Sequence, residues 1–269
     1  MINCPVMFLQ NSFKRSLFLS LIWAAVIPVA YAAPQSDEKQ VLTRARQKYY
    51  NLRSSGLIEL QSNIKPNWEL VLAGVESNPN TMRLLSALQF SMSIDPDSKF
   101  RMDHHADIMP LDPKPFAEVN RVFKGMEEAV SRFIATWSVF MLTAPFPAIE
   151  SNCEVRKTED QYHFSHKEGA NDVLTITDKD FMIVEIKVSG SGFNASLKPL
   201  LENTAKGFIL KGYSANYQTG ARNTVVKVRL DYQEVSGLQL PSKVNVDTVY
   251  EGKPAQIEWV FTDYRVKVR

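Results

Sequence analysis

The feature that most constrains the fold is a long run of short strand-like segments after Glu150. Stretches rich in β-branched and aromatic residues alternate there with turn signals such as Ser236-Gly237 and Glu251-Gly252. Connections this short favour antiparallel hairpins, because parallel strands need a crossover of a dozen or more residues. The expected strands are 153–157, 160–166, 172–177, 181–188, 193–200, 206–218, 224–235, 241–250 and 255–264. The second half of the chain is therefore predicted to be an antiparallel meander.

The first half of the chain mixes helical and strand patterns, which makes the predicted class α+β. Ser36 is expected to cap a helix whose apolar face runs from Val41 to Leu52, with Gly56 ending the segment. Strict alternation predicts strands over 58–64 and 88–94, and a return strand that begins at Phe100. Residues 67–88 are expected to be helical in part, with a break at 78–80.

One long helix is predicted over residues 116–142, behind the proline cluster 110–115 and ahead of Pro145 and Pro147. Its apolar residues recur at intervals of three and four, and several are aromatic. Such a stripe fits two arrangements: a core packed on a sheet, or a cover over an apolar cavity whose methionines adapt to an acyl chain. The candidate ligand-binding residues are Phe90, Met92, Phe133, Trp137, Phe140 and Met141.

The N-terminus has the three parts of a secretory signal peptide. Lys14-Arg15 precedes the apolar run 16–29, and Ala30-Tyr31-Ala32 forms a small-x-small cleavage site. We expect cleavage after Ala32, one domain over residues 33–269, and a periplasmic protein that does not span a membrane. An uncleaved anchor is the alternative, because the apolar stretch is near the lower limit for spanning a bilayer.

Charge and cysteine content exclude some classes of function. The chain has 31 Lys and Arg and 29 Asp and Glu, and removal of residues 1–32 takes away two of the basic residues and none of the acidic ones. The mature charge is then zero, so we expect no nucleic-acid partner. Cys4 leaves with the signal peptide, and Cys153 alone cannot form an internal disulfide.

Residues that could carry chemistry are sparse. Asp103-His104-His105-Ala106-Asp107 is the richest cluster of metal-ligand types, but a zinc site needs three or four converging ligands. Neighbouring histidines on a strand point to opposite faces, as do His163 and His166, which are three residues apart. The sequence contains no G-x-S-x-G, no H-E-x-x-H, and no S-x-x-K accompanied by its S-D-N and K-T-G partners. We expect no metal, no cofactor and no enzymatic activity, with a hydrolase as the third possibility.

Two C-terminal motifs carry a resemblance to a known family. Residues 232–241 read Y-x-E-V-x-G-L-x-L-P and residues 261–266 read F-x-D-Y-R-V. Together with the export signal, these resemble the last strands of the LolA-like outer-membrane lipoprotein carrier superfamily. The resemblance implies an incomplete (half) barrel, an antiparallel sheet covered by one long helix and shorter N-terminal helices, with a pocket for lipid chains. The chain also resembles uncharacterised exported bacterial proteins, which imply no activity.

The expected function is binding or carriage of a lipid, a lipoprotein acyl chain or another apolar ligand in the cell envelope. The alternative is a non-catalytic envelope interaction or scaffold protein whose barrel is filled by its own side chains. In that case the partner would be another envelope protein. A filled core and a cavity have the same apolar pattern, so the sequence leaves both possibilities open.

Overall fold

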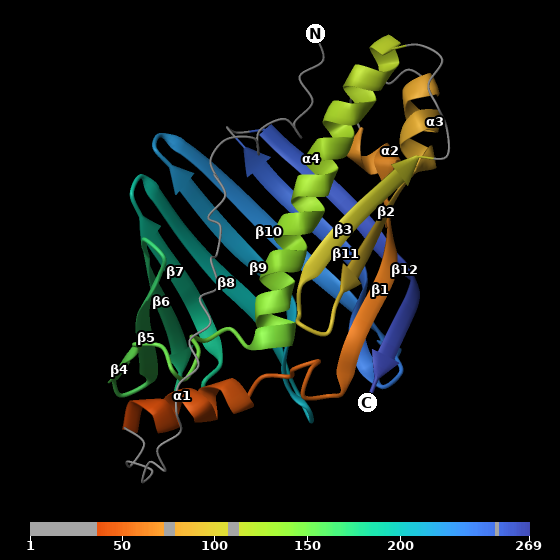
Figure 1. Ribbon diagram of the computed structural model, residues 1–269. Helices are drawn as coiled ribbons and strands as arrows, with labels where there is room; N and C mark the ends of the chain where they lie inside the picture. The colour runs from red at the N-terminus through yellow and green to blue at the C-terminus, as the bar shows by residue number, and fades with distance from the viewer. Residues whose placement is uncertain (1–36, 73–78, 107–112, 251–252) are drawn as a thin grey trace, which may run out of the picture.

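The computed structural model describes residues 37–72, 79–106, 113–250 and 253–269 (Figure 1). The expected signal segment, the Ser36 cap, Asp107 and the first part of the proline cluster lie outside the described residues. The helical elements are α1 (Asp37–Gln47), α2 (Trp68–Val71), α3 (Pro79–Ala87), α4 (Pro113–Ser138) and the π-helical turn η2 (Val139–Thr143). The strands are β1 (Leu57–Pro66), β2 (Leu88–Ile94), β3 (Phe100–Ala106), β4 (Glu154–Lys157), β5 (Gln161–Glu168), β6 (Asn171–Asp178), β7 (Ile183–Gly190), β8 (Phe193–Thr204), β9 (Gly207–Thr219), β10 (Arg222–Val235), β11 (Leu238–Tyr250) and β12 (Lys253–Val268).

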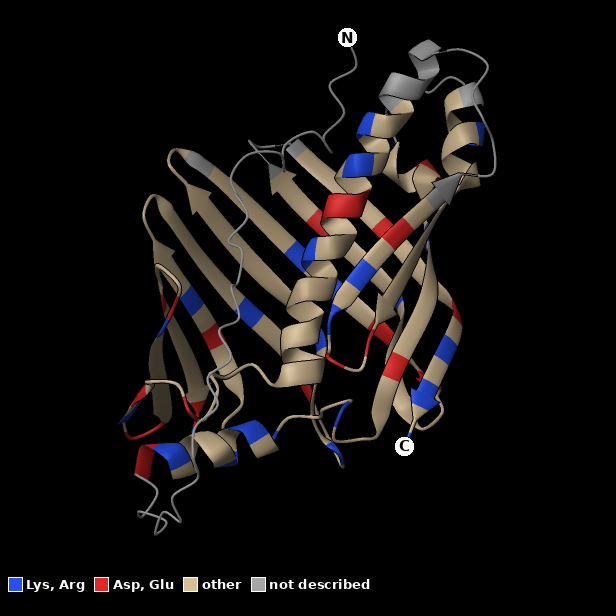
Figure 2. Ribbon diagram, viewed as in Figure 1, with Lys and Arg blue, Asp and Glu red and all other residues tan. Residues whose placement is uncertain are grey.

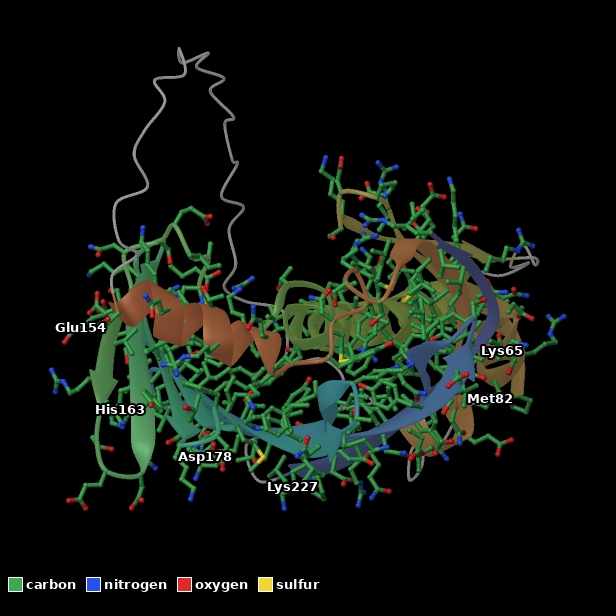
Figure 3. The ribbon with its side chains drawn as sticks, turned by 90° about the horizontal axis from the view of Figure 1, so that it is seen from below. Lys65, Met82, Glu154, His163, Asp178 and Lys227 are labelled. Atoms are coloured by element: carbon green, nitrogen blue, oxygen red, sulfur yellow. The ribbon has the colours of Figure 1, made fainter. Side chains whose placement is uncertain are left out.

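The strands of the described residues form one twelve-stranded sheet in the order β3-β2-β1-β12-β11-β10-β9-β8-β7-β6-β5-β4. Every neighbouring pair is antiparallel, and every pair except β1 with β12 joins strands that follow each other in the chain. The predicted α+β class and antiparallel meander are confirmed. The sheet curves strongly but does not close, because β3 and β4 remain as separate edges (Figure 3).

Helix α4 lies against the concave face of the sheet, while α1 crosses one end of it (Figures 1 and 3). From Val119 onward the apolar stripe of α4 is buried and joins the apolar residues of the strands in one continuous core. The end of α4 nearest η2, residues 133–138, carries no Lys, Arg, Asp or Glu (Figure 2). The long helix was therefore predicted correctly, and its stripe forms the centre of the core. Among the described residues, no helix is long and apolar enough to cross a membrane.

The first helix is shorter than predicted. It ends at Gln47, so Tyr49 and Leu52 lie beyond it. The chain instead pairs with β9: the Phe208 amide donates to the Lys48 carbonyl at 2.8 Å, and the Tyr50 amide donates to the Phe208 carbonyl at 3.0 Å. Gly207, at φ +111°, permits this approach, since a Cβ there would lie 2.7 Å from the Lys48 carbonyl oxygen. Backbone pairing with Phe208, about 160 residues away in the sequence, therefore outweighs the helical pattern of these residues.

Both ends of α4 also differ from the prediction. The helix starts at Pro113 and includes Pro115, which the first turn tolerates because its amides have no helical partner. At the other end the predicted α-helix becomes a π-helical turn, and Ala144 follows it at φ +70°. Arg46 fixes this end by donating to the carbonyls of Thr143 (2.7 Å), Phe146 (2.7 Å) and Pro147 (2.8 Å).

The sheet divides at the end next to α1. Pairing between β9 and β10 stops at Gly212 and Arg229, and pairing between β11 and β12 stops at Lys243 and Val260. The tip of the β10–β11 hairpin, residues 230–242, therefore has no backbone ladder to either neighbour within the described residues. This free tip carries the Y-x-E-V-x-G-L-x-L-P motif noted in the sequence.

Three tyrosine hydroxyls fasten the hairpin tip to its surroundings. Tyr232 donates to the Leu210 carbonyl of β9 at 2.6 Å. Tyr264, which belongs to β12, donates to the Pro241 carbonyl of the tip at 2.6 Å. The Tyr50 hydroxyl accepts from the Gln239 amide at 3.1 Å. Burial raises the pKa of both Tyr232 and Tyr264. These side chains replace the missing ladder bonds on both sides of the tip.

Candidate ligand-binding strip on the concave face

The six residues predicted to bind a ligand lie in the core. Phe90 and Met92 belong to β2, Phe133 and Trp137 to α4, and Phe140 and Met141 to η2, and none is more than 2% exposed. They pack on other side chains: Phe90 stacks on Phe123 with ring centres 4.3 Å apart, and Phe133 meets Trp259 edge to face at 5.7 Å. That these residues line a ligand pocket stays a prediction. In this arrangement their own side chains fill the space between α4 and the sheet.

A different part of the concave face is less covered. Two adjacent cross-strand rows run over β7, β8, β9 and β10. One row pairs Ile186 with Leu197, Leu197 with Ala215, and Ala215 with Val226; the other pairs Val188 with Ala195 and Ala195 with Tyr217. We define the concave strip as the six half-buried members: Ile186, Val188, Ala195, Leu197, Tyr217 and Val226.

Burial changes in a step from the helix-covered rows to the concave strip. Tyr213 and Val228, one row nearer the end where α1 lies, are 7% and 3% exposed. Two positions along β10, Val226 is half-buried, whereas Ala215, two positions along β9, is still buried at 3%. Ile186, Leu197, Tyr217 and Val226 nevertheless pack against the core. In Figure 1, α4 crosses the sheet to one side of this region and α1 lies below it. An apolar surface of about 14 Å across the strands and about 7 Å along them is therefore only partly covered by described residues.

Two polar groups lie on the concave strip or in line with its rows. Tyr217 is close to α4, where burial raises the pKa of its hydroxyl and the positive charge of Arg132 opposes that rise. Arg132 itself is half-exposed and pairs with Glu128 at 2.6 Å. His166 on β5 lies two strands beyond β7, past the buried Val173 of β6. Burial lowers the pKa of His166, and its Nδ1 has no hydrogen-bond partner among the described residues. None of the six strip residues is acidic or basic.

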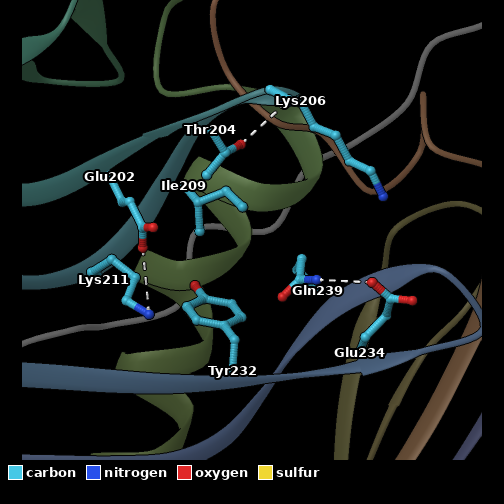
Figure 4. A pocket seen from close by; sticks show the side chains of 9 residues that line it. Glu202, Thr204, Lys206, Ile209, Lys211, Tyr232, Glu234 and Gln239 are labelled. Carbon is cyan, nitrogen blue, oxygen red and sulfur yellow. Dashed lines mark hydrogen bonds and ion pairs between the residues drawn. The ribbon is translucent and has the colours of Figure 1, made fainter.

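A second feature is a groove of about 420 Å³ where β9 and β10 separate (Figure 4). It is lined by Glu202, Thr204, Ala205, Lys206, Ile209, Lys211, Tyr232, Glu234 and Gln239. Lys211 lies 3.6 Å from Glu202 and 5.4 Å from the Tyr232 ring centre, while Gln239 donates to Glu234 at 3.3 Å. The backbone edge of β9 inside the split already bonds Lys48, Tyr50 and Tyr232. The groove thus offers charged side chains but no open strand edge at Phe208.

The groups considered for chemistry do not converge. Within the described ranges, no three His, Cys, Asp or Glu side chains are placed to hold a metal ion. His104 packs edge to face on Phe123 at 4.7 Å and lies 3.7 Å from Glu127. Cys153 is half-buried and precedes β4. Burial, with help from Glu38 and Glu154, raises its pKa to about 11, which disfavours the reactive thiolate.

Sequence reasoning did not single out the concave strip. Residues 181–188 and 193–200 were predicted as strands, and they correspond to parts of β7 and β8. No sequence pattern indicates which of these rows α4 leaves uncovered, because that depends on where the helix crosses the sheet. The aromatic stripe drew attention to the most deeply buried residues instead.

Comparison with known proteins adds no assignment to this geometry. No protein-family model, no curated protein and no solved structure matches the chain.

Proposed function

We propose that the protein binds a lipid, an acyl chain or another apolar ligand on the concave strip, and carries or holds it in the cell envelope without catalysis. The observation that supports this function is the step in burial beside α4. There, six apolar side chains on four strands stay half-buried around the buried Ala215, whereas the apolar residues of α4 from Val119 onward are buried. Exposed apolar surface of this kind favours a ligand or partner, since it gains free energy when it is covered.

The proposed fold family, export and location come from the sequence analysis. The fold is a LolA-like half barrel, the N-terminal segment exports the chain, and the mature protein works in the periplasm. The antiparallel sheet, its open curvature and the long helix on its concave face support the LolA-like assignment. The separated hairpin tip coincides with the first of the two resembling motifs. The site differs from the pocket first expected, because it lies beside α4 on β7 to β10.

A matched pair of adjacent residues on β8 tests the location of the site. Leu197 lies in the concave strip, whereas Lys198 is exposed and belongs to the other face of the strand. The protein beginning at Ala33 would be titrated with a fluorescent fatty acid. Leu197→Glu should weaken binding at least tenfold, because a carboxylate against an apolar ligand loses hydration. Lys198→Glu should change it less than twofold.

Equal binding by Leu197→Glu and the wild type would contradict the proposed site. Circular dichroism and denaturant unfolding of both variants check that the fold survives, which is expected for a half-buried position. Native mass spectrometry of protein purified from its own periplasm would identify a co-purifying lipid. Absence of dye binding and of a bound lipid in the wild type would contradict the carrier function itself.

The second candidate is a non-catalytic interaction or scaffold protein. Two observations favour it: α4 fills most of the concave face with its own side chains, and the groove beside the hairpin tip presents Lys206, Lys211, Glu202 and Glu234. A bare mass and no fatty-acid binding, together with a normal stable fold, would support this candidate over the carrier.

A further inference from the structure

We propose that the free edge of β3 binds one extended peptide segment of a partner protein. The segment adds to the sheet as an antiparallel strand, with a basic residue opposite Asp103 and an acidic residue opposite Arg101. This inference goes beyond the proposed function, since β3 is an outer strand of the sheet and lies outside the concave strip. It follows from the open backbone of β3, from its charges and from the curvature of the sheet.

The two outer edges of the sheet differ in how they are covered. At β4, which has four residues, the amide of Val155 donates to Glu38 of α1 at 3.5 Å. β3 has seven residues, and within the described ranges no backbone hydrogen bond from another element reaches its outer side. An uncovered strand edge is a template for pairing with another chain. β3 is therefore the edge to which a further strand can add.

The register of the β2–β3 hairpin fixes which backbone groups point outward. The Asp95 amide donates to the Lys99 carbonyl at 3.1 Å, so these two residues form a hydrogen-bonded pair. Hydrogen-bonded and non-hydrogen-bonded pairs alternate along an antiparallel ladder, and the next pair contains Phe100. The N–H and C=O groups of Phe100, Met102 and His104 therefore point away from β2. Each of these residues offers one donor and one acceptor to an added strand.

The loop between β2 and β3 holds this edge in place. Arg53 donates to Ser98 Oγ at 3.0 Å and also to the Asp95 carbonyl. The Lys99 amide donates to Asp95 Oδ1 at 2.8 Å. Because the loop is already ordered, an added strand causes less loss of conformational entropy than it would beside a mobile hairpin. The edge is pre-organised for binding.

The side chains of β3 define the segment that fits. Arg101 and Asp103 are exposed, and neither forms an ion pair with a described residue. Phe100 and Met102, on the other face of the strand, are half-buried and pack against the core. Residues directly opposite each other on antiparallel strands interact, and opposite charges stabilise the pair. A segment that reads apolar, basic, apolar, acidic, apolar from its N-terminus therefore matches β3 in the antiparallel direction.

The curvature of the sheet favours a single segment over a second copy of the chain. The sheet curls round α4 toward β3 (Figure 3), and the His104 ring lies 4.7 Å from the ring of Phe123 on that helix. If two copies paired through β3 about a two-fold axis, both concave faces would lie on the same side of the joined sheet. Each copy would then bring its own α4 and remaining strands toward those of the other. A lone strand has no such bulk.

Two labelled peptides that differ only in the order of their charges test the proposal. They are Thr-Val-Lys-Val-Glu-Val-Thr and Thr-Val-Glu-Val-Lys-Val-Thr, both acetylated and amidated, titrated with the protein beginning at Ala33 and followed by fluorescence anisotropy. The first should bind at least fivefold more tightly, because it places opposite charges beside Arg101 and Asp103. The double variant Arg101→Glu with Asp103→Lys should invert the preference. Arg156→Glu, on an exposed residue of β4, should leave it unchanged.

The double variant is expected to fold, because Ser93 and Ser91 lie opposite the two altered positions on β2 and carry no charge. Circular dichroism checks this. Methylation of the central valine nitrogen of the first peptide should weaken binding at least tenfold, since that N–H faces Met102. Methylation of the glutamate nitrogen, which points away from β3, should weaken it less than threefold.

Three results would overturn the proposal. They are equal binding of the two peptides, no binding of either by millimolar protein, and a preference that the double variant retains. Sedimentation velocity tests the other occupant: self-association of the wild type that Arg101→Glu removes would assign the edge to a second copy and also overturn the proposal. Fatty-acid binding should be the same with and without the peptide, so a failure at the β3 edge is distinguishable from a failure at the concave strip.

Discussion

Replacing Trp137 with alanine distinguishes two hypotheses. In one, α4 packs on a filled core, and in the other it is a movable cover over a cavity. The side chain is 0% exposed and lies in the last turn of α4, just before η2. A buried tryptophan removes roughly 200 Å² from water, and at about 25 cal/mol per Å² its loss amounts to about 5 kcal/mol. Measured large-to-small changes at such sites cost about 3–5 kcal/mol. We therefore expect Trp137→Ala to lower the free energy of unfolding by about 4 kcal/mol.

Equilibrium urea unfolding, followed by circular dichroism, measures this loss. With a slope of about 3 kcal/mol per M, the midpoint should fall by roughly 1.3 M. Val139→Ala is the matched control, because Val139 lies two residues further along and is 45% exposed. It should change stability by less than about 0.5 kcal/mol. A loss below about 1 kcal/mol for Trp137→Ala would refute the filled core and return the ligand site to the space beneath α4.

Two further predictions concern side-chain hydrogen bonds that hold the hairpin tip and the end of α4, and a third concerns the reactivity of Cys153. Tyr232→Phe should cost about 1–2 kcal/mol in urea unfolding, because the Leu210 carbonyl loses its 2.6 Å donor at the hairpin tip. Arg46→Ala should cost about 2–3 kcal/mol, since three carbonyls at the end of α4 lose a charged donor, whereas Arg44→Ala should cost less than about 1 kcal/mol. With a pKa of about 11, the Cys153 thiol should react slowly with a disulfide reagent at pH 8 and about tenfold faster per pH unit up to about pH 10. A reaction rate that levels off near pH 9 would contradict the last prediction.

The strand content was predictable because each strand carries its own alternation and its own turn signals. Residues 88–94, for example, were predicted as a strand and form β2 with the same ends. Segments with a distant partner were predicted less well. Tyr49 and Leu52 continue the helical pattern of α1, but pairing with Phe208 outweighs the weak local preference.

The site was harder to predict than the fold for a related reason. Aromatic residues such as Phe133 and Trp137 dominate any search for a lipid pocket, yet their size makes them the first to be buried. The concave strip includes small residues such as Val188 and Ala195, which have no distinctive pattern of their own. Their role depends on the crossing position of α4, and this is set by packing over the whole sheet.

The single pairing between β1 and β12 has a consequence for how the chain folds. All other strand pairs form between chain neighbours, so β4 to β12 can assemble by adding one hairpin after another. The sheet made by β1, β2 and β3 has no neighbour until β12, the last strand, is available. During synthesis this early three-stranded unit must wait, with one edge of β1 unpaired, for about 150 residues of chain. Loss of the last 15 residues should therefore disrupt the N-terminal strands first, and a newly made chain is most prone to aggregation before its final strand arrives.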